Sequence, residues 1–579
     1  MTPATRIVRR PLTASPDALP ETLHPVLRRV YAARSVAGTA DLDRSLTCLP
    51  PPERLAGTAE AADRLARALR SDEHILIVGD FDADGATSTA VAVRALAGMG
   101  ARRVSYLVPN RFQYGYGLTP EIVAVARGRS PDLIVTVDNG VASVAGVAAA
   151  NAAGIDVIVT DHHLPGRELP AAAVIVNPSL PDAGFPSRAL AGVGVIFYVM
   201  LALRAQLRRD GWFARQGLAE PNLATLLDLV ALGTVADVVP LDRVNRVLVA
   251  QGLERIRTGR ACPGIGALLE LADRDPRRAT TTDLGFFVGP RLNAAGRLED
   301  MAVGIDCLLT DDPLRARELA AILDSFNRER RRIEQDMQAQ ALAMVEGLHL
   351  EGAGELPVGL CLYDPAWHQG VVGLLASRLK ERLYRPVVAF APGEPGWLKG
   401  SGRSVPGVHM RDVLDAVATC HPGLLERFGG HAMAAGLTLR EADLAAFSTA
   451  FDAEVRRWLA PEDMAGVIQS DGEIAAADLE LGLAEAIRAG GPWGQGFPEP
   501  LFDNAFEVMD RRVVGGQHLR LILRPLDGRR GIEAIAFHQA ERAAAGVPAR
   551  LRVAYNLEVN DFRGESRVQL RVAHWEAEQ

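Results

Sequence analysis

The chain has 579 residues and a formal net charge of −8 at pH 7, with 48% hydrophobic and 23% charged residues. This composition is typical of a soluble globular protein and excludes a mainly disordered chain, and the length predicts two to four domains. The five cysteines are scattered and free of CxxC spacing, which excludes a disulfide-rich secreted scaffold and predicts reduced thiols in a cytoplasm.

Membrane insertion and secretion are not expected. The most apolar run, residues 193–203, is shorter than the roughly 20 residues that a membrane-spanning helix needs, and we expect a buried helix there. The N-terminal arginines, Arg6, Arg9 and Arg10, are not followed by an apolar stretch, so the pattern of a secretory signal is missing.

Residues 1–60 are rich in proline and arginine, and we expect an irregular arm or a packing segment. From residue 61 to 311, apolar runs typical of buried strands alternate with helical stretches, which predicts a parallel sheet flanked by helices. The expected strands are residues 75–78, 104–108, 133–137, 156–160 and 173–176, and an apolar helix is expected at 223–232.

The segment from 312 to 350 predicts one long helix, because residues 314–345 contain neither glycine nor proline and are rich in helix-forming residues. Its basic run, residues 328–332, either faces DNA or is a solvated face, and the sequence leaves both open. From 351 to 462 a second, smaller α/β unit is expected, with strands at 358–363 and 386–390 around a helix at 371–383.

The last part, residues 463–579, changes to alternating polar and apolar residues. Segments 518–524, 551–557 and 567–572 have this pattern, with glycine-bearing turns between strands. Such segments predict a small β-barrel.

Three aspartates, Asp80, Asp82 and Asp84, directly follow the predicted strand at 75–78. So much negative charge at a strand end requires a nearby cation. An EF-hand loop begins with the same D-x-D-x-D-G spacing, but its twelfth position should be Glu and here is Val91, which excludes that motif. Because ligands of open α/β sheets gather at the carboxyl ends of the strands, we expect a divalent-metal site.

Similar clusters end the next strands. Asp138 follows the strand at 133–137. The strand at 156–160 is followed by Asp161, His162 and His163. Asp237 lies between apolar neighbours, and a buried carboxylate there needs a partner. Carboxylates with one or two imidazoles and no cysteine suit Mn²⁺ or Mg²⁺. Mn²⁺ is favoured because imidazole is a softer donor than Mg²⁺ usually accepts, and zinc is the second choice.

Together these segments resemble the four motifs of the DHH phosphoesterase superfamily, and within it the RecJ family of single-strand-specific 5′ to 3′ exonucleases. The first motif, with its three aspartates, has the form found in that family. Further matching segments are residues 108–117, 289–297, 400–404 and 429–436. The resemblance covers nearly the whole chain and implies a DHH domain at 61–311, a connecting helix at 312–350, a DHH-associated domain at 351–462 and an OB-fold domain at 463–579.

The resemblance also implies two metal ions. The ligands that it implies are Asp80, Asp82, Asp84, Asp138, His162 and Asp237. Two metals about 4 Å apart can generate a hydroxide, neutralise the phosphoryl oxygens and stabilise the leaving alkoxide. Asp161 is expected to orient His162 or His163, and His163 itself either binds metal, contacts the phosphate or tunes the water.

Arg291 is expected, by resemblance, to bind the scissile phosphate with its guanidinium fork. From the sequence alone, a salt bridge is the alternative. The small residues around Arg291 would permit close backbone approach to a ligand.

The resemblance implies that Arg111, Ser401 and Arg403 hold the 5′ phosphate, and a hydroxyl with paired arginines suits a phosphate. The glycine-rich segment around Ser401 could equally be a flexible surface turn. The other residues expected to contact DNA are Phe112, Tyr114, Tyr116, Asn293, Arg297, His368 and His431. The three aromatic residues in this set would stack on unpaired bases, or else pack in the core.

The resemblance therefore implies a metal-dependent exonuclease that degrades single-stranded DNA from its 5′ end to mononucleotides, in recombination and repair. A monomer is expected, with single-strand-binding protein and a helicase as candidate partners. The negative net charge does not oppose this, because an acidic total is compatible with a basic groove. Two rivals stay open: a nanoRNA or cyclic-dinucleotide phosphodiesterase of the same superfamily, and a non-catalytic single-strand-binding scaffold.

Overall fold

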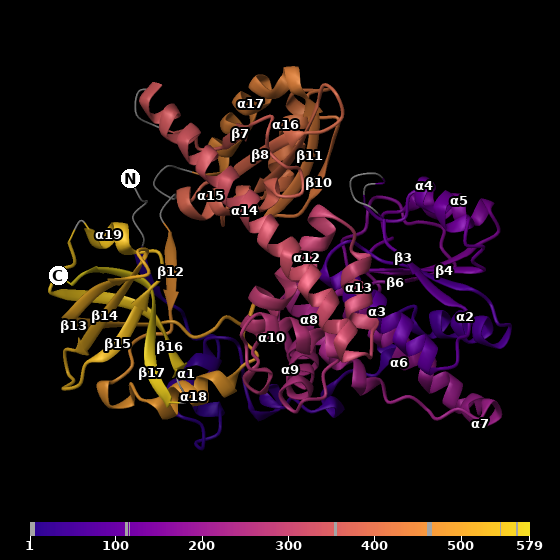
Figure 1. Ribbon diagram of the computed structural model, residues 1–579, viewed down its shortest axis with the longest axis horizontal. Helices are drawn as coiled ribbons and strands as arrows, with labels where there is room; N and C mark the ends of the chain where they lie inside the picture. The colour runs from indigo at the N-terminus through magenta and orange to yellow at the C-terminus, as the bar shows by residue number, and fades with distance from the viewer. Residues whose placement is uncertain are drawn as a thin grey trace. The chain divides into compact units, whose positions relative to one another are not determined.

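The computed structural model describes residues 6–109, 114, 116–351, 356–459, 466–544, 546–562 and 565–578. The chain forms two compact units. One contains residues 9–327 and 470–579, and the other contains residues 328–469 with the first eight residues. The long helix α14 (Pro313–Glu351) runs from one unit into the other, as the sequence predicts (Figure 1).

A five-stranded parallel sheet forms the centre of the first unit. Its order is β3-β2-β4-β5-β6, and all four strand pairs are parallel. The strands are β2 (Ile75–Val78), β3 (Val104–Leu107), β4 (Leu133–Val137), β5 (Asp156–Thr160) and β6 (Val174–Val176), which confirms the five predicted strands. Because β3 and β4 lie on opposite sides of β2, the strand order reverses between β2 and β4.

Helices cover both faces of this sheet (Figure 1). Leu76 and Val78 point toward the core beneath α4 (Pro120–Arg127) and α5 (Val144–Ala152). Ile75 and Ile77 point to the other core, which contains residues of α2 (Thr58–Arg70), α3 (Ala83–Gly98) and α6 (Gly192–Arg209). Burial on both faces explains why β2 is apolar at every position and β4 at all but Thr136.

A largely helical segment follows the sheet. It contains α7 (Trp212–Gln216), α8 (Leu227–Ala236), α9 (Arg243–Arg257), α10 (Pro263–Leu271), α11 (Thr281–Asp283), the π-helix η7 (Leu284–Val288), α12 (Gly289–Leu298) and α13 (Ala302–Leu309). The helix predicted at 223–232 begins as a 3-10 turn, capped by Asn222, and continues as α8.

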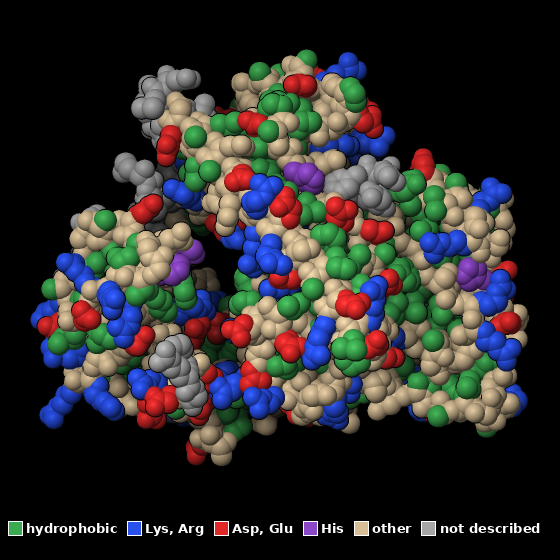
Figure 2. Space-filling view, viewed as in Figure 1, with side chains coloured by type: hydrophobic (Ala, Val, Ile, Leu, Met, Phe, Trp, Pro, Cys, Tyr) green, Lys and Arg blue, Asp and Glu red, His purple; other side chains and the backbone are tan. Residues whose placement is uncertain are grey.

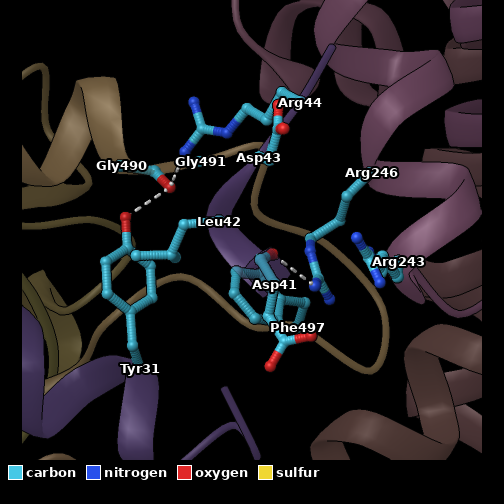
Figure 3. A pocket seen from close by; sticks show the side chains of 10 residues that line it. All are labelled: Tyr31, Asp41, Leu42, Asp43, Arg44, Arg243, Arg246, Gly490, Gly491 and Phe497. Carbon is cyan, nitrogen blue, oxygen red and sulfur yellow. Dashed lines mark hydrogen bonds between the residues drawn. The ribbon is translucent and has the colours of Figure 1, made fainter. Parts of the chain in front are cut away.

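The N-terminal arm is a packing segment that contains α1 (Pro25–Ala32). Tyr31 is buried, and its hydroxyl donates to the carbonyl of Gly490 at 2.9 Å. Figure 3 shows Tyr31 and Arg44 directed at Gly490, and Arg246 of α9 at Phe497, whose ring lies 4.4 Å from the guanidinium carbon. The arm therefore joins α9 to the segment that precedes the barrel.

The barrel has five strands in the closed order β13-β14-β15-β17-β16. They are β13 (Phe502–Val514), β14 (His518–Pro525), β15 (Ile532–Ala536), β16 (Arg550–Phe562) and β17 (Glu565–Ala577), with α18 (Leu481–Gly490) before the barrel and α19 (Ala540–Ala544) between β15 and β16. Along β14, buried residues alternate with partly exposed ones, as the sequence pattern predicts.

The second unit is the predicted smaller α/β unit. Its sheet has the order β10-β11-β9-β8-β7, in which only β7 and β8 are parallel. Its elements are β7 (Leu360–Tyr363), α15 (Val372–Leu383), β8 (Val387–Pro392), β9 (Trp397–Arg403), α16 (Met410–Cys420), β10 (Arg427–Gly430), β11 (Ala434–Arg440) and α17 (Leu444–Trp458). A separate pair of strands, β1 (Arg6–Arg9) and β12 (Val467–Ser470), lies where the chain passes between the units. Among the helices that the structure describes, none is long and apolar enough to cross a membrane.

Candidate metal centre

The aspartates of the first motif lie where β2 ends and α3 begins. Asp82 is the N-cap of α3, and its Oδ1 accepts a hydrogen bond from the N–H of Gly85 at 3.0 Å. Asp80 Oδ1 accepts from the N–H of Phe81 at 2.8 Å, and Asp84 is buried in the first turn of the helix. The helix occupies the place of a calcium-binding loop, which agrees with the exclusion of an EF-hand.

The second motif follows β4, which lies beside β2. The N–H of Asp138 donates to the carbonyl of Thr160 at 3.0 Å. The amide of Asn139 donates to the carbonyls of Val78, at 3.1 Å, and Val137, at 2.9 Å, and so ties the end of β2 to the end of β4. Because the strand order reverses between these two strands, both motifs meet at the crevice where open α/β sheets bind ligands.

His162 and Asp237 complete the cluster. Nε2 of His162 lies 3.1 Å from Oδ1 of Asp138 and 3.5 Å from Oδ2 of Asp237, the C-cap residue of α8. Three sets of side chains have ligand atoms within 4.8 Å of one another: Asp80 with Asp82 and Asp138, Asp84 with His162 and Asp237, and Asp138 with His162 and His163. The structure therefore brings together all six side chains predicted as ligands.

The cluster fits a divalent cation. Among the described residues, none donates a hydrogen bond to the buried Oδ1 of Asp138. Burial, followed by the charge of Asp84, raises the pKa of Asp138 and of Asp237 well above the ordinary value. Burial and the charge of Asp82 raise the pKa of Asp84 to about 7. A bound cation would stabilise these mutually repelling carboxylates as anions, so the donor set suits Mn²⁺ or Mg²⁺.

Two glycines leave room for the carboxylates. A Cβ at Gly192, the first residue of α6, would lie 2.5 Å from Oδ1 of Asp138. A Cβ at Gly233, within α8, would lie 2.7 Å from Oδ1 of Asp84. Both helices can approach the cluster only because these positions lack a side chain.

His163 is oriented by Asp161, whose Oδ1 lies 2.8 Å from its Nδ1. The second carboxylate oxygen of Asp161 accepts from the N–H of Val141 at 2.9 Å. Burial, the largest single effect, opposes a charge on His163, but the hydrogen bond to Asp161 and the negative charges of Asp161, Asp237 and Asp80 together raise the pKa of His163 to about 9. Burial is likewise the largest single effect on Asp161 and opposes its ionisation, but the hydrogen bond and charge of His163, with the backbone N–H groups of Val141 and His163, together lower the pKa of Asp161.

Tyr116 lies over this pair. Its hydroxyl is 3.2 Å from Nδ1 of His163 and donates to the carbonyl of Asp138 at 3.2 Å, while the residue is 47% exposed. Tyr114 packs against the core beneath α4, which agrees with the core-packing alternative. Arg111 and Phe112 lie outside the described residues.

Helix α12 lies against the first motif. Oδ1 of Asn293 accepts from the N–H of Ala83 at 2.8 Å. A Cβ at Gly296 would lie only 1.7 Å from the carbonyl oxygen of Phe81. The small residues of α12 thus allow this helix to lie close to the backbone of the first motif. The sequence suggested instead that they permit close approach to a ligand.

Arg291 forms a salt bridge, the alternative that the sequence left open. Its Nε lies 2.9 Å from Oδ1 of Asp324, and its Nη1 donates to the carbonyl of Phe287 at 2.7 Å. Its contact with a scissile phosphate stays a prediction. Arg297 lies in the last turn of α12.

In the second unit, Ser401 and Arg403 lie on β9, and Nη1 of Arg403 donates to Oγ of Ser401 at 3.0 Å. Burial lowers the pKa of Arg403. A Cβ at Gly373, in the first turn of α15, would lie 2.9 Å from Nη2 of Arg403 and 3.0 Å from Oγ of Ser401. A guanidinium, a hydroxyl and a helix N-terminus therefore meet, and each can bind an anion.

Two histidines lie in segments that border this group. His368 precedes α15, and its Nδ1 accepts from the N–H of Gly370 at 3.1 Å. The N–H of His431 donates to the carbonyl of Ala434 at 2.7 Å, and Ala434 pairs with Arg403 across the two strands. The structure thus groups these predicted DNA contacts with Ser401 and Arg403.

Sequence reasoning missed Asn139, Gly192 and Gly233, which support the carboxylate cluster from outside, and Gly373, which lies against Ser401 and Arg403. Asn139 lies in the second motif and Gly233 begins the segment that leads to Asp237, so both stand beside predicted ligands. Gly192 and Gly373 carry no local signal, because their role is set by contacts with residues distant in the sequence.

Three family models match the chain. They are described as the DHH family N-terminal domain, which matches residues 74–234, the DHHA1 domain, at 357–457, and the RecJ OB domain, at 470–574.

Curated relatives match almost the whole chain. The single-stranded-DNA-specific exonuclease RecJ of Dickeya dadantii is 55% identical over 575 residues, covering 99% of each chain. The protein of the same name from Escherichia coli is 52% identical over 563 residues, covering 97% of each chain. Among solved structures, RecJ from Thermus thermophilus in complex with Mn²⁺ is 30% identical with a TM-score of 0.80, over 100% of this chain and 80% of that one. The complex with Mg²⁺ has a TM-score of 0.74 at 29% identity, over 100% and 79%.

Proposed function

The chain belongs to the RecJ family of single-stranded-DNA-specific exonucleases, and we propose that the cluster around Asp138 is the centre at which it hydrolyses the strand. It is a metal-dependent exonuclease that acts on single-stranded DNA with Mn²⁺ or Mg²⁺. The observation that carries the proposal is the meeting of Asp138, His162 and Asp237, within 3.1 to 3.5 Å, at the reversal of the strand order.

The proposed ligands of two metal ions are Asp80, Asp82, Asp84, Asp138, His162 and Asp237. When bound, the ions supply a water of lowered pKa and positive charge for the phosphoryl and leaving oxygens. The chain's own residues fix the geometry. Asp82 is held by the first turn of α3, and Asn139 keeps the ends of β2 and β4 together. Asp161 keeps His163 oriented, so that His163 would bind metal, contact the phosphate or tune the water.

For the direction of degradation, we propose that the 5′ phosphate binds at Ser401 and Arg403, with Arg111 as a further contact. The hydroxyl, the guanidinium and the first turn of α15 at Gly373 support this assignment. An enzyme that binds the 5′ end in this way releases mononucleotides in the 5′ to 3′ direction. His368, His431, Arg291, Arg297, Phe112 and Tyr116 are proposed as further contacts with the strand. Of the other residues expected there, Asn293 supports the first motif and Tyr114 packs against the core.

The surface charge is compatible with a DNA substrate. Figure 2 shows that Lys and Arg side chains are interspersed with Asp and Glu over one face, including the barrel. The acidic total of −8 therefore does not produce a uniformly negative surface on this face.

The remaining expectations are part of the proposal. We propose the domain boundaries 1–60, 61–311, 312–350, 351–462 and 463–579, a cytoplasmic location, a monomer, a role in recombination and repair, and single-strand-binding protein and a helicase as partners. The three matched family regions, at 74–234, 357–457 and 470–574, lie within the proposed DHH, DHH-associated and OB-fold domains.

The test is degradation of a 5′-phosphorylated single strand labelled at its 3′ end, with Mn²⁺, beside a strand blocked at its 5′ end. Ordered shortening from the 5′ end is expected. The Asp138→Ala protein should leave the strand intact, while Asp156→Ala, which changes a carboxylate at the opposite edge of the sheet, should retain activity.

Equal cleavage of the blocked strand would contradict the 5′-phosphate site. Rapid loss of only a very short oligonucleotide, beside an intact long strand, would favour the phosphodiesterase rival. Binding of the strand without hydrolysis, under any divalent metal, would favour the scaffold.

A further inference from the structure

Phe286 is an exposed aromatic residue on a helical turn of unusual geometry. It lies in the π-helix η7, whose first and last residues, Leu284 and Val288, are fully buried. Phe286 itself is 71% exposed, more than any other large apolar side chain among the described residues. A π-helical turn winds less favourably than an α-helix and is frequent at functional sites. An isolated exposed hydrophobic residue would need no explanation, so its surroundings decide the matter.

The turn that carries Phe286 is fixed in place. Asp283 closes a capping box with Thr280 and pairs with Nε of Arg274 at 2.6 Å. The guanidinium of Arg274 lies 4.7 Å from the ring centre of Phe287. Oγ1 of Thr281 donates to the carbonyl of Trp493 at 2.6 Å. The turn that carries Phe286 is therefore fixed by contacts of its neighbours, while the Phe286 side chain itself is exposed.

This turn packs on the part of α8 that leads to the metal centre. A Cβ at Gly285 would lie 3.2 Å from Cγ1 of Val235, and a Cβ at Gly289 would lie 3.2 Å from Cβ of Ala236. The next residue is Asp237, whose Oδ2 lies 3.5 Å from Nε2 of His162. The turn that carries Phe286 thus packs against the two residues of α8 that directly precede the proposed ligand Asp237.

Val238 adds a second exposed apolar side chain beside Asp237. It is 63% exposed and has a φ of 62°, in the left-handed region that a β-branched residue rarely adopts. Three residues later the chain is fixed again, because the N–H of Leu241 donates to the carbonyl of Gln495 at 2.7 Å. Strain of this kind persists only where the surrounding structure holds it, and it is frequent at ligand sites.

From these contacts we infer that Phe286 is the surface on which one unpaired base of the substrate stacks while its strand reaches the carboxylate cluster, and that Val238, the residue after Asp237, offers the strand a second apolar contact. The inference rests on the proposed function of that cluster. A base presents a flat apolar face that is free only in a single strand, and an exposed aromatic ring accepts any of the four bases. A paired base has no such free face, so this contact also contributes to the preference for single strands.

The test measures release of the first nucleotide in a single turnover with Mn²⁺. The enzyme is in excess of the DNA but below the concentration that saturates binding. Phe286→Ala should lower this rate about 5- to 100-fold, which is the range expected for the loss of one base–aromatic stack. Phe286→Trp should restore it. Leu314→Ala is the matched control: this side chain is 69% exposed, lies in the same unit and should change nothing.

Strands with a single abasic position, scanned along the first nucleotides, identify the base. At one position, the missing base should slow the wild-type protein as much as Phe286→Ala slows cleavage of an intact strand. At that position the missing base should not slow the Phe286→Ala protein any further. The inference is overturned if Phe286→Ala cleaves at the wild-type rate, or if its loss is the same on every abasic strand. A wild-type protein that releases no nucleotide at all would refute the proposed function instead.

Discussion

Asp84 is bound by the beginning of α6: its Oδ2 accepts a hydrogen bond from the N–H of Gly192 at 2.7 Å, and its Oδ1 accepts from the N–H of Val193 at 3.0 Å. The N-terminus of a helix stabilises negative charge, so α6 holds this carboxylate in a fixed orientation. The same Gly192 faces Oδ1 of Asp138 on its other side. One backbone position therefore sets the distance between two proposed ligands.

Gly192→Ala should weaken metal binding without removing a ligand. The added Cβ would lie 2.5 Å from Oδ1 of Asp138, so α6 or Asp138 must move. Loss of such a support typically costs about 10- to 100-fold in metal affinity. Calorimetric titration with Mn²⁺ measures this. Gly266→Ala, in α10 with no atom within 4 Å of the added Cβ, is the control: it should keep the affinity and raise stability by up to about 1 kcal/mol.

Asp138→Asn should have opposite effects on stability and activity. Without metal, removal of one carboxylate from a cluster whose members raise one another's pKa should raise the melting temperature. With Mn²⁺ the wild-type protein should gain stability and the variant should gain little. Hydrolysis should fall by more than about 10³-fold, since a metal contributes several kcal/mol to the barrier. A variant that is stabilised by Mn²⁺ as strongly as the wild type would show that Asp138 is not a ligand.

Asn293→Ala should act through the first motif. Removal of the hydrogen bond to the N–H of Ala83 loosens the start of α3, so the affinity for Mn²⁺ and kcat should each fall about tenfold while KM for a long strand stays the same. Steady-state kinetics with a long labelled strand separates the two constants. If KM rises while the Mn²⁺ affinity is unchanged, Asn293 contacts DNA directly, as the sequence suggested.

His574 should make the barrel sensitive to acid. Burial, and next to it the guanidinium of Arg542, lower the pKa of His574 to about 4 from 6.5. As the pH falls, His574 is protonated in the unfolded chain before it is protonated in the folded protein. The stability that neutral His574 contributes to the folded protein is therefore complete above pH 6.5 and is lost between pH 6.5 and 4. The loss is on the order of 3 kcal/mol. Glutamine does not titrate, so the His574→Gln protein lacks this pH dependence. Urea unfolding at about pH 7 and about pH 4.5 should show a smaller decrease in the free energy of unfolding for the variant than for the wild type. Parallel decreases would contradict the assignment.

The central sheet could be predicted because its signals are local. Residues 75–78 and 133–137 are apolar at each position or nearly so, and the structure buries both segments completely. The aspartates that follow them were recognisable for the same reason, since parallel strands bring their carboxyl ends to one edge. The first motif and Asp138 therefore came together as expected.

Contacts between distant segments could not be predicted. The bond from Asn293 to Ala83 spans 210 residues, and nothing near either residue indicates it. The pairing of Arg291 with Asp324 depends on how α12 meets α14. The π-helical winding at Leu284–Val288 requires an extra residue per turn, and the sequence there has the composition of any buried helix.

The burial of the N-terminal arm has a consequence for the order in which the protein can fold. The two terminal guanidinium nitrogens of Arg34 each donate to the carboxylate of Asp471 at 2.8 Å, although 437 residues separate the two side chains, and Tyr31 stacks on Trp493. A ribosome that adds about 5 to 20 residues per second needs tens of seconds to make that partner. During this time the arm carries apolar and cationic side chains without their native contacts, so the nascent chain completes its N-terminal structure only when its last third emerges.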